Sequence, residues 1–308
     1  MWATMPQPTH QENYSLPPAL KLYSSSTLNF EKHPDIPVAS FATFFHGPLS
    51  GVEITCIQSF IDHGHEITIY CYRDYGAPPH FKTADASAIL PESRVFFYKR
   101  GVGKGSVSAF SNLFRYTLLA RLTGIWWVDS DVVCLSDQWP PHRDIGAAWE
   151  AAGIIGSAVL YCSPAIAGEL AEQASQMGEN ITWGEAGPRL VTSCLRTKSL
   201  EGEILASSIF YPLPYASWRM SFDKRHLDEM ERRCASAYTL HLWHEMLRRS
   251  RFNKNALPDP GSFFGRLVAR HRTEQYFDDK ERDEERPGVR SLLGSIQNWT
   301  KNHLGKST

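Results

Sequence analysis

The sequence lacks the features that mark several classes of protein. No apolar run is long enough to span a bilayer, and the polar, proline-rich stretch over residues 1–18 contains no apolar signal-peptide region. The formal net charge is −1, which gives no reason to expect nucleic acid as a partner. We also find no internal repeat. From these absences we expect a cytoplasmic protein, and we leave open peripheral contact with the inner face of a membrane.

The sequence also lacks paired cysteines. Its six cysteines are scattered, and none forms a C-x-x-C pair. Most of them lie in apolar surroundings such as ITIYCYR and DVVCL. This pattern favours buried thiols in a reducing compartment over a disulfide framework or a zinc site.

What is present is an alternation of strand-like and helix-like segments. Short apolar runs and helical apolar spacing predict strands at 38–45, 65–73, 93–99 and 125–128, and helices at 52–64 and 108–124. Strands that alternate with helices predict an α/β fold with a mostly parallel central sheet flanked by helices. The second half is less regular. By composition we expect a flexible leader over 1–36, a folded domain over 37–270 and a charged C-terminal tail or helix over 271–308.

Two carboxylates stand at the end of a predicted strand. Asp129 and Asp131 follow the apolar run 125–128, and ligands in parallel α/β sheets bind beyond the carboxyl ends of strands. One interpretation is a Mg²⁺ or Mn²⁺ ion shared with a substrate diphosphate. A second is an aspartyl-phosphate on Asp129, as in haloacid-dehalogenase-like phosphatases. A third is a solvated surface turn. A calcium loop is excluded, because the glycine and terminal glutamate it needs are missing.

The context of the pair disfavours the phosphatase. That family's motif opens the first strand of its domain, whereas here three predicted strands precede the strand at 125–128 that carries the motif. Its late acidic pair would have to be Asp278-Asp279, after the poor strand TEQYF. The phosphatase therefore stays as the alternative.

Four separated blocks resemble sugar transferases of the GT-A fold that carry a D-x-D motif. The block SAFSNLFRYTLLARLTGIWWVDSDVVCL resembles their Ser-Asp-x-x-Arg-Tyr helix, glycine turn, aromatic strand and D-x-D. FFHGPLSGVEITCIQSFIDHGHEITIY resembles their opening, where a loop meets the nucleotide. TWGEAGPRLVT and the His-x-Trp at 241–243 resemble alpha-1,4-galactosyltransferase-like and capsular polysaccharide sugar transferases. The blocks span about 38–265 in the family's order.

The resemblance implies a GT-A, Rossmann-like domain over 37–270 whose C-terminal half faces the acceptor. It implies a hexosyltransferase that moves a sugar from a nucleotide-sugar, a UDP-sugar, to a glycan or lipid-linked glycan with retention, in the synthesis of a surface polysaccharide or related glycan. Mn²⁺ or Mg²⁺ would be held by Asp131 directly, by Asp129 through water or the ribose, and by His241. Glu185 would stabilise an oxocarbenium ion, and Arg115 would hold the donor by its planar fork.

The resemblance also implies a donor-binding set. Its members are Phe45, His46, Gly47, Ser111, Asn112, Arg115, Trp183, Gly184 and Gly187. Asn112 stands where the family has aspartate, which leaves the donor's identity open. Tyr215 and Trp218 are candidates for the acceptor cleft, with core packing as the alternative. A silent glycan-binding protein with this fold also stays open, and the mixed apolar and basic stretch 262–272 suggests a membrane contact or a packed terminal helix.

Overall fold

A six-stranded sheet forms the centre of the described chain, which comprises residues 39–178 and 181–278 of the computed structural model. The strands follow the order β3 (Lys82–Asp85), β2 (Glu66–Cys71), β1 (Ser40–Phe44), β4 (Ile125–Val128), β9 (Val159–Cys162) and β6 (Ile145–Gly146). The first four strands run parallel, and β9 is antiparallel to both β4 and β6. The expected α/β fold with a mostly parallel sheet is confirmed.

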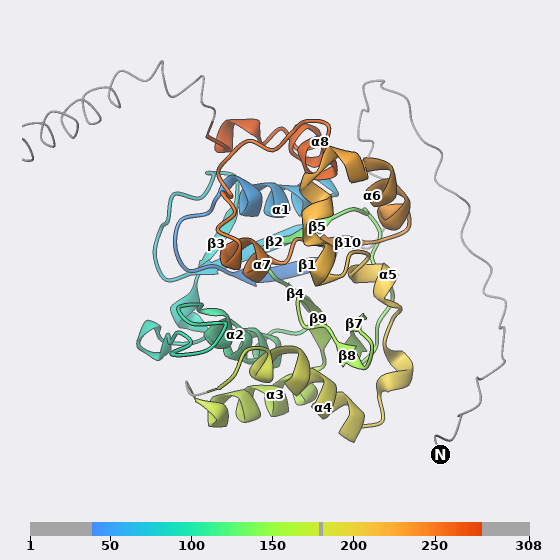
Figure 1. The fold of residues 1–308 in the computed structure, drawn as a ribbon. Coiled ribbons are helices and arrows are strands. Elements are labelled where there is room, and N and C mark those ends of the chain that lie inside the picture. The colour runs from blue at the N-terminus through green and yellow to red at the C-terminus, as the bar shows by residue number, and fades with distance from the viewer. Residues whose placement is uncertain (1–38, 179–180, 279–308) are drawn as a thin grey trace, which may run out of the picture. The chain divides into compact units, whose positions relative to one another are not determined.

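Helices cover both faces of this sheet (Figure 1). On one side lies α1 (Gly51–Asp62); on the other lie α2 (Ser108–Arg121) and α3 (Pro164–Met177), which pack against each other. Successive strand residues supply the two cores: Phe41 and Trp126 belong to the cluster under α1, whereas Ala42 and Trp127 belong to the cluster over α2. Alternation along the strands therefore produces two apolar layers.

The predicted strand at 93–99 is wrong. Residues 92–94 form a single 3₁₀ turn, and the chain that follows is not paired in the sheet. The backbone of Tyr98 instead pairs locally with Gly105 and Ser106. The third parallel strand is β3, whose sequence KTAD is polar and which lies at the sheet edge. An edge strand with little buried surface leaves no apolar pattern in the sequence.

The second half consists of short elements. β5 (Val132–Cys134) pairs with β10 (Thr239–His241), and β7 (Trp149–Ala151) pairs with β8 (Ile154–Ile155), both antiparallel. The short helices are α4 (Leu190–Thr197), α5 (Ser207–Phe210), α6 (Leu227–Cys234), α7 (His244–Arg249) and α8 (Phe263–Arg270). This agrees with the less regular structure expected there.

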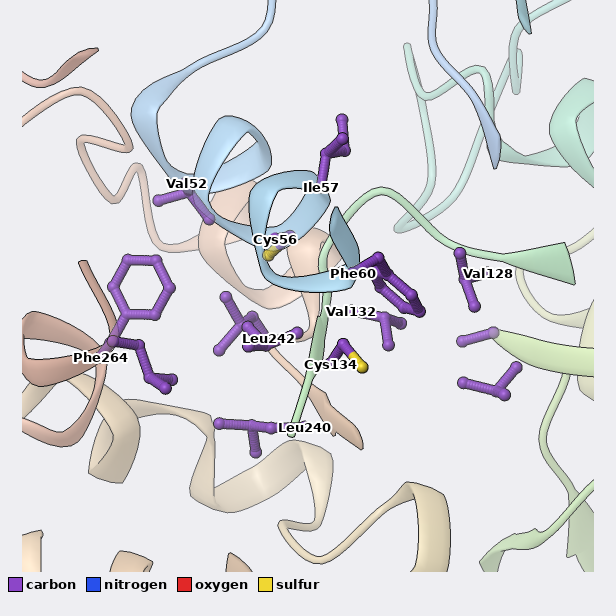
Figure 2. Close-up of a cluster of buried hydrophobic side chains, with 14 of the residues drawn as sticks. Val52, Cys56, Ile57, Phe60, Val128, Val132, Cys134, Leu240, Leu242 and Phe264 are labelled. Carbon is purple, nitrogen blue, oxygen red and sulfur yellow. The ribbon is translucent and has the colours of Figure 1, made fainter. Parts of the chain in front are cut away.

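Side chains from α1, β5, β10 and α8 pack together in one buried cluster (Figure 2). Leu240 and Leu242 of the β10 segment are completely buried in it, and Phe264 joins it from α8. The apolar face of α8 is thus used inside the molecule, as in the packed-helix alternative for residues 262–272. No helix in the two described ranges is long and apolar enough to cross a bilayer.

The packed chain continues past Arg270. Thr273 and Phe277 are buried, the Thr273 hydroxyl lies 2.6 Å from that of Thr55 on α1, and the Phe277 ring covers Gly51. Packing therefore extends to Asp278, beyond the expected domain end at 270, because these side chains complete the surface of α1. The expected leader over 1–36 and the tail beyond Asp278 lie outside the described residues.

Candidate active site

Asp129 and Asp131 lie in a tight loop between β4 and β5. The amide of Asp129 donates to the carbonyl of Ala158 on the neighbouring chain segment (2.8 Å), and Val132 N–H donates back to the Asp129 carbonyl (3.1 Å). The loop leaves the carboxyl end of a parallel strand, as the sequence predicted. Both carboxylates line a cavity of about 730 Å³, a size typical of small-molecule sites.

Strand pairing brings His241 to these carboxylates from far along the sequence. His241 is opposite Val132 in the β5–β10 ladder, and Leu242 N–H donates to the Asp131 carbonyl at 2.9 Å. Because Leu240 and Leu242 point into the core, the residue between them points to the opposite face. The His241 Nε2 atom lies 3.1 Å from Asp131 Oδ2.

The resulting triad has the donor set of a metal site. One ligand atom each from Asp129, Asp131 and His241 lies within 4.8 Å of the others. Two carboxylates and an imidazole suit Mn²⁺, whereas Mg²⁺ prefers oxygen ligands alone. The residues present therefore fit a divalent cation, and the role of each as a ligand stays a prediction.

Burial and charge set the protonation of the triad. Burial raises the pKa of Asp131, but the charge and hydrogen bond of His241 outweigh it and hold that pKa well below its usual range. Burial also raises the pKa of Asp129; Arg115 opposes this, and the charge of Asp131 adds to it. Burial would lower the pKa of His241, but the neighbouring carboxylates raise it overall. The surroundings therefore favour the ionised form more strongly at Asp131, the predicted direct metal ligand, than at Asp129.

Arg115 is buried beside the triad rather than exposed on the surface of α2. Its Nη2 donates to Asp129 Oδ1 at 2.5 Å, and its guanidinium lies over the Trp127 ring at 5.0 Å from the centroid. Trp127 Nε1 donates to the same carboxylate oxygen at 2.7 Å. Arg115 Nε and Nη1 are buried, and neither has a partner among the residues that the structure describes. Unpaired buried donors of this kind are suited to an anionic ligand.

Most of the predicted donor-binding residues meet at the same cavity. Its lining includes Phe45, His46, Ser111, Asn112, Arg115, Trp183 and Gly184. Gly47 lines a neighbouring cavity of about 450 Å³ that shares Phe45. Gly187 packs against Asn112 instead, since a Cβ on Gly187 would lie 3.2 Å from Asn112 Nδ2.

Glu185 does not line the cavity. Its carboxylate accepts hydrogen bonds from the Thr182 amide (2.7 Å) and hydroxyl (2.9 Å), and these bonds lower its pKa. The side chain thus closes its own turn, and the structure gives it no contact with the triad. Glu185 was expected to point toward the reacting centre, and the structure places it elsewhere. Its carboxylate forms local hydrogen bonds with Thr182 and does not point into the cavity.

Of the two candidates for the acceptor cleft, the structure places one at the cavity and the other in the core. Tyr215 is 55% exposed and lines the cavity, whereas Trp218 is buried in the core with Arg219 stacked over its ring.

The phosphatase alternative requires Asp278 at the site. The Asp278 amide donates to the Asn255 carbonyl, and the residue does not line the cavity. Asp279 lies outside the described residues. Nothing in the site supports the phosphatase.

Sequence reasoning missed three residues at the site. Glu150 on β7, Trp243 and His244 all line the cavity, and the His244 amide donates to Asp131 Oδ2 at 2.5 Å. No motif marks Glu150, because the β7–β8 hairpin alone brings it there. Trp243 is the last residue of the His-x-Trp segment and His244 follows it directly, so their spacing to His241 was the available signal.

One family model matches part of the second half of the chain. Residues 174–276 match the family model described as the alpha 1,4-glycosyltransferase conserved region. This range contains the W-G-x-x-G-P block and His241, while the D-x-D lies before it.

Similar proteins are also sugar transferases. Lactosylceramide 4-alpha-galactosyltransferase of Pan troglodytes is 28% identical over 81 residues, and that of Homo sapiens is 27% identical; each alignment covers 23% of this chain and 23% of the relative. Among solved structures, PaToxG glycosyltransferase has a TM-score of 0.40 at 13% identity, covering 78% of this chain and 87% of that chain. The apo form of the glycosyltransferase GlyE of Streptococcus pneumoniae TIGR4 has a TM-score of 0.35 at 11% identity, covering 78% and 64%. Over residues 174–276 the chain is thus similar to the conserved region of the alpha 1,4-glycosyltransferases, and its alignments span about a quarter of the length of these relatives.

Proposed function

We propose that this protein is a metal-dependent glycosyltransferase that moves a sugar from a UDP-sugar to a glycan or lipid-linked glycan. The observation that carries the proposal is the Asp129–Asp131–His241 cluster that lines the cavity, beside a buried arginine with donors that no described residue pairs with. The matched family region supplies the reaction class.

The donor's diphosphate would lie between the triad and Arg115. Asp131, Asp129 and His241 would hold a divalent cation, whose positive charge would offset the charge that develops on the leaving phosphate. The Arg115 fork, held by Asp129 and Trp127, binds a donor oxygen with its Nε and Nη1 atoms. Asn112, buried on the same face of α2, binds a sugar hydroxyl.

The neighbouring cavity would take the donor's nucleoside. It adjoins the first through Phe45 and is lined by Tyr75 and by the carboxylates Asp74 and Asp85 at the ends of β2 and β3. An aromatic ring can stack on the base, and carboxylates can accept hydrogen bonds from the ribose hydroxyls.

We propose retention of configuration. The bond from the anomeric carbon to the phosphate oxygen breaks, and the phosphate keeps its electron pair. The acceptor hydroxyl oxygen bonds to the same carbon from the same face, and its proton passes to the departing phosphate. The family's alpha linkage supports this, because the sugar of a UDP-hexose donor is itself alpha-linked.

A thermal-shift panel tests the proposal. UDP, GDP, ADP, UDP-galactose and UDP-glucose would be added with Mn²⁺ or with chelator to wild type, Asp131→Ala and the control Asp137→Ala, whose aspartate is exposed beyond β5. We expect a uridine nucleotide to raise the melting temperature only with Mn²⁺, in wild type and control but not in Asp131→Ala. A well-folded wild type that no nucleotide stabilises would overturn the proposal.

A further inference from the structure

The cavity continues past the metal triad to a second group of side chains. Glu150 on β7, Tyr215 at the start of a 3₁₀ turn (Tyr215–Phe222) and Trp243 before α7 line this end. In Figure 1, β7 and α2 lie on opposite sides of β4. A chain of contacts gives the order: Arg115 pairs with Asp129, His241 with Asp131, and the His241 ring lies 4.1 Å from that of Trp243.

Trp243 is held in an unusual backbone conformation at this end. Its φ and ψ are 61° and 58°, in the left-handed region that a bulky aromatic residue rarely adopts. The indole Nε1 donates to the Leu213 carbonyl at 2.9 Å, which fixes the ring beside His241. Strained residues of this kind persist where the surrounding structure holds them, and they cluster at ligand sites.

Tyr215 extends this aromatic surface outward. Its ring centroid lies 6.2 Å from that of Trp243 in an edge-to-face arrangement. The preceding Pro214 has an extended backbone, and the proline ring restricts the approach of the chain to Tyr215. At 55% exposure, Tyr215 presents a ring face to solvent at the cavity mouth. An exposed but rigidly mounted aromatic ring is suited to stack on the C–H face of a sugar.

Glu150 adds a polar group to the same end. It lies at the irregular register of the β7–β8 hairpin and lines the cavity, and within the described ranges its carboxylate has no hydrogen-bond or ion-pair partner. Its charge interacts with those of His241, Asp129 and Arg115, which places it close to the reacting centre. A carboxylate in this position is a hydrogen-bond acceptor available to a ligand hydroxyl.

We propose that Glu150, Tyr215 and Trp243 form the subsite for the acceptor, and that the acceptor's terminal unit is a sugar whose ring stacks on the exposed Tyr215, which the buried Trp243 supports, while a hydroxyl donates to Glu150. This inference rests on the proposed function, because it assigns the Arg115 end to the donor. It makes Glu150 and Tyr215 determinants of acceptor binding and not of nucleotide binding.

The test measures sugar binding and nucleotide binding in the same samples. The full chain with Mn²⁺ and UDP is mixed with a panel of galactose, glucose, lactose, maltose and cellobiose, and saturation-transfer NMR gives a dissociation constant for each sugar. Tyr215→Ala and Glu150→Gln are compared with wild type. Leu257→Ala and Glu172→Gln, at exposed positions outside the cavity, serve as matched controls. The UDP-dependent thermal shift is recorded for every variant.

We expect at least one sugar of the panel to bind wild type. Its dissociation constant should rise five-fold or more in Tyr215→Ala and Glu150→Gln, stay unchanged in the controls, and leave the UDP shift intact. If UDP binds but no sugar does, or if sugar binding survives both substitutions, the acceptor subsite is wrong while the proposed function stands. If wild type shows no UDP shift with Mn²⁺, the proposed function fails and the subsite fails with it.

Discussion

Arg115 shows how a single buried side chain links the helix to the reacting centre. One guanidinium nitrogen pairs with Asp129, the guanidinium lies over the Trp127 ring, and its two other nitrogens have no partner within the described part of the chain. A buried donor without a partner costs free energy in the free protein. An oxyanion of the donor would remove that cost, so we expect the planar shape of the side chain, and not only its charge, to matter.

Arg115→Lys keeps the positive charge and loses the planar fork. We expect the dissociation constant of UDP with Mn²⁺ to rise about ten-fold, equivalent to about 1.4 kcal/mol. Isothermal titration calorimetry measures it, with Arg121→Lys as the control, because Arg121 lies on the same helix, donates to the Ala88 carbonyl and does not line the cavity. Equal affinities in both variants would contradict the role of Arg115.

His63 at the end of α1 makes stability depend on pH. Burial, with the charge of His271, lowers the pKa of His63 to about 4. The folded state therefore binds fewer protons than the unfolded chain, whose histidine pKa is about 6.5. This contribution to stability is complete above pH 6.5 and is lost as the pH falls toward 4, amounting to roughly 3 kcal/mol.

Urea unfolding of His63→Gln at pH 7 and pH 5 measures this effect. The variant should lose less stability than wild type between the two values. Some loss should remain, because burial also lowers the pKa of His65. His226→Gln, at an exposed position, should keep the wild-type difference. A His63→Gln variant with the full wild-type loss would exclude His63 as the source.

At the residue scale, the sequence predicted the site residues that belong to a local motif. Asp129, Asp131 and Arg115 were found because they stand at fixed spacing around one strand. Glu150 was missed because only the hairpin β7–β8 brings it to the cavity. Glu185 was misplaced because its bond to Thr182 depends on the local turn, which residue type alone does not determine.

Among the elements, α1 is joined to α7 by a buried charge network. Glu53 of α1 is completely buried; it pairs with Lys254, and its Oε1 lies 3.2 Å from His244 Nδ1. Burial would raise the pKa of Glu53, but His244 and Lys254 lower it to about 2. Since the His244 amide also bonds Asp131, this network holds one side of the metal triad.

Glu53→Gln removes the charge and leaves Lys254 with no buried counter-charge. We expect a loss of about 3 kcal/mol of unfolding free energy, at the low end for a broken buried pair because Lys254 is partly exposed. Chemical denaturation at pH 7 measures it. The double variant Glu53→Gln/Lys254→Met should recover part of the loss. Additive losses would show that the two residues are not coupled.

Two glycines should respond to alanine in opposite directions. A Cβ on Gly146 in β6 would lie 2.1 Å from the Trp126 ring, whereas Gly168 in α3 has open space around it. We expect Gly146→Ala to lose roughly 1–3 kcal/mol through overpacking, and Gly168→Ala to gain roughly 0.5–1 kcal/mol of helix stability. Melting curves of the two variants test this: a Gly146→Ala variant at least as stable as wild type would contradict the close packing of β6 on Trp126, and a Gly168→Ala variant that loses stability would contradict the open space at α3.

The elements themselves were predictable where apolar side chains repeat. β1, β4, α1 and α2 follow the expected segments because each buries an apolar face. The polar strand β3 and the irregular stretch 95–99 were not predicted. The pairing of β3 at the sheet edge and the local pairing of Tyr98 with Gly105 depend on tertiary contacts that leave no apolar pattern in the sequence.

Across the whole described chain, the site is assembled from both halves. The first half supplies the D-x-D loop and α2, and the second supplies His241, Trp243 and Tyr215. The antiparallel β5–β10 pair joins them, with the core of Figure 2 beneath it. The matched family region alone, residues 174–276, therefore holds only one of the three predicted metal ligands.

The most direct test is the reaction itself. The full chain would be incubated with UDP-galactose or UDP-glucose, with Mn²⁺ or chelator, and released UDP and free phosphate would be measured beside Asp131→Asn and Asp137→Asn. The account predicts UDP release from at least one donor that requires Mn²⁺, survives in Asp137→Asn and falls at least a hundred-fold in Asp131→Asn, equivalent to about 2.7 kcal/mol. UDP release that persists in chelator or in Asp131→Asn would contradict the account. So would a preparation that releases free phosphate from the donor but no UDP.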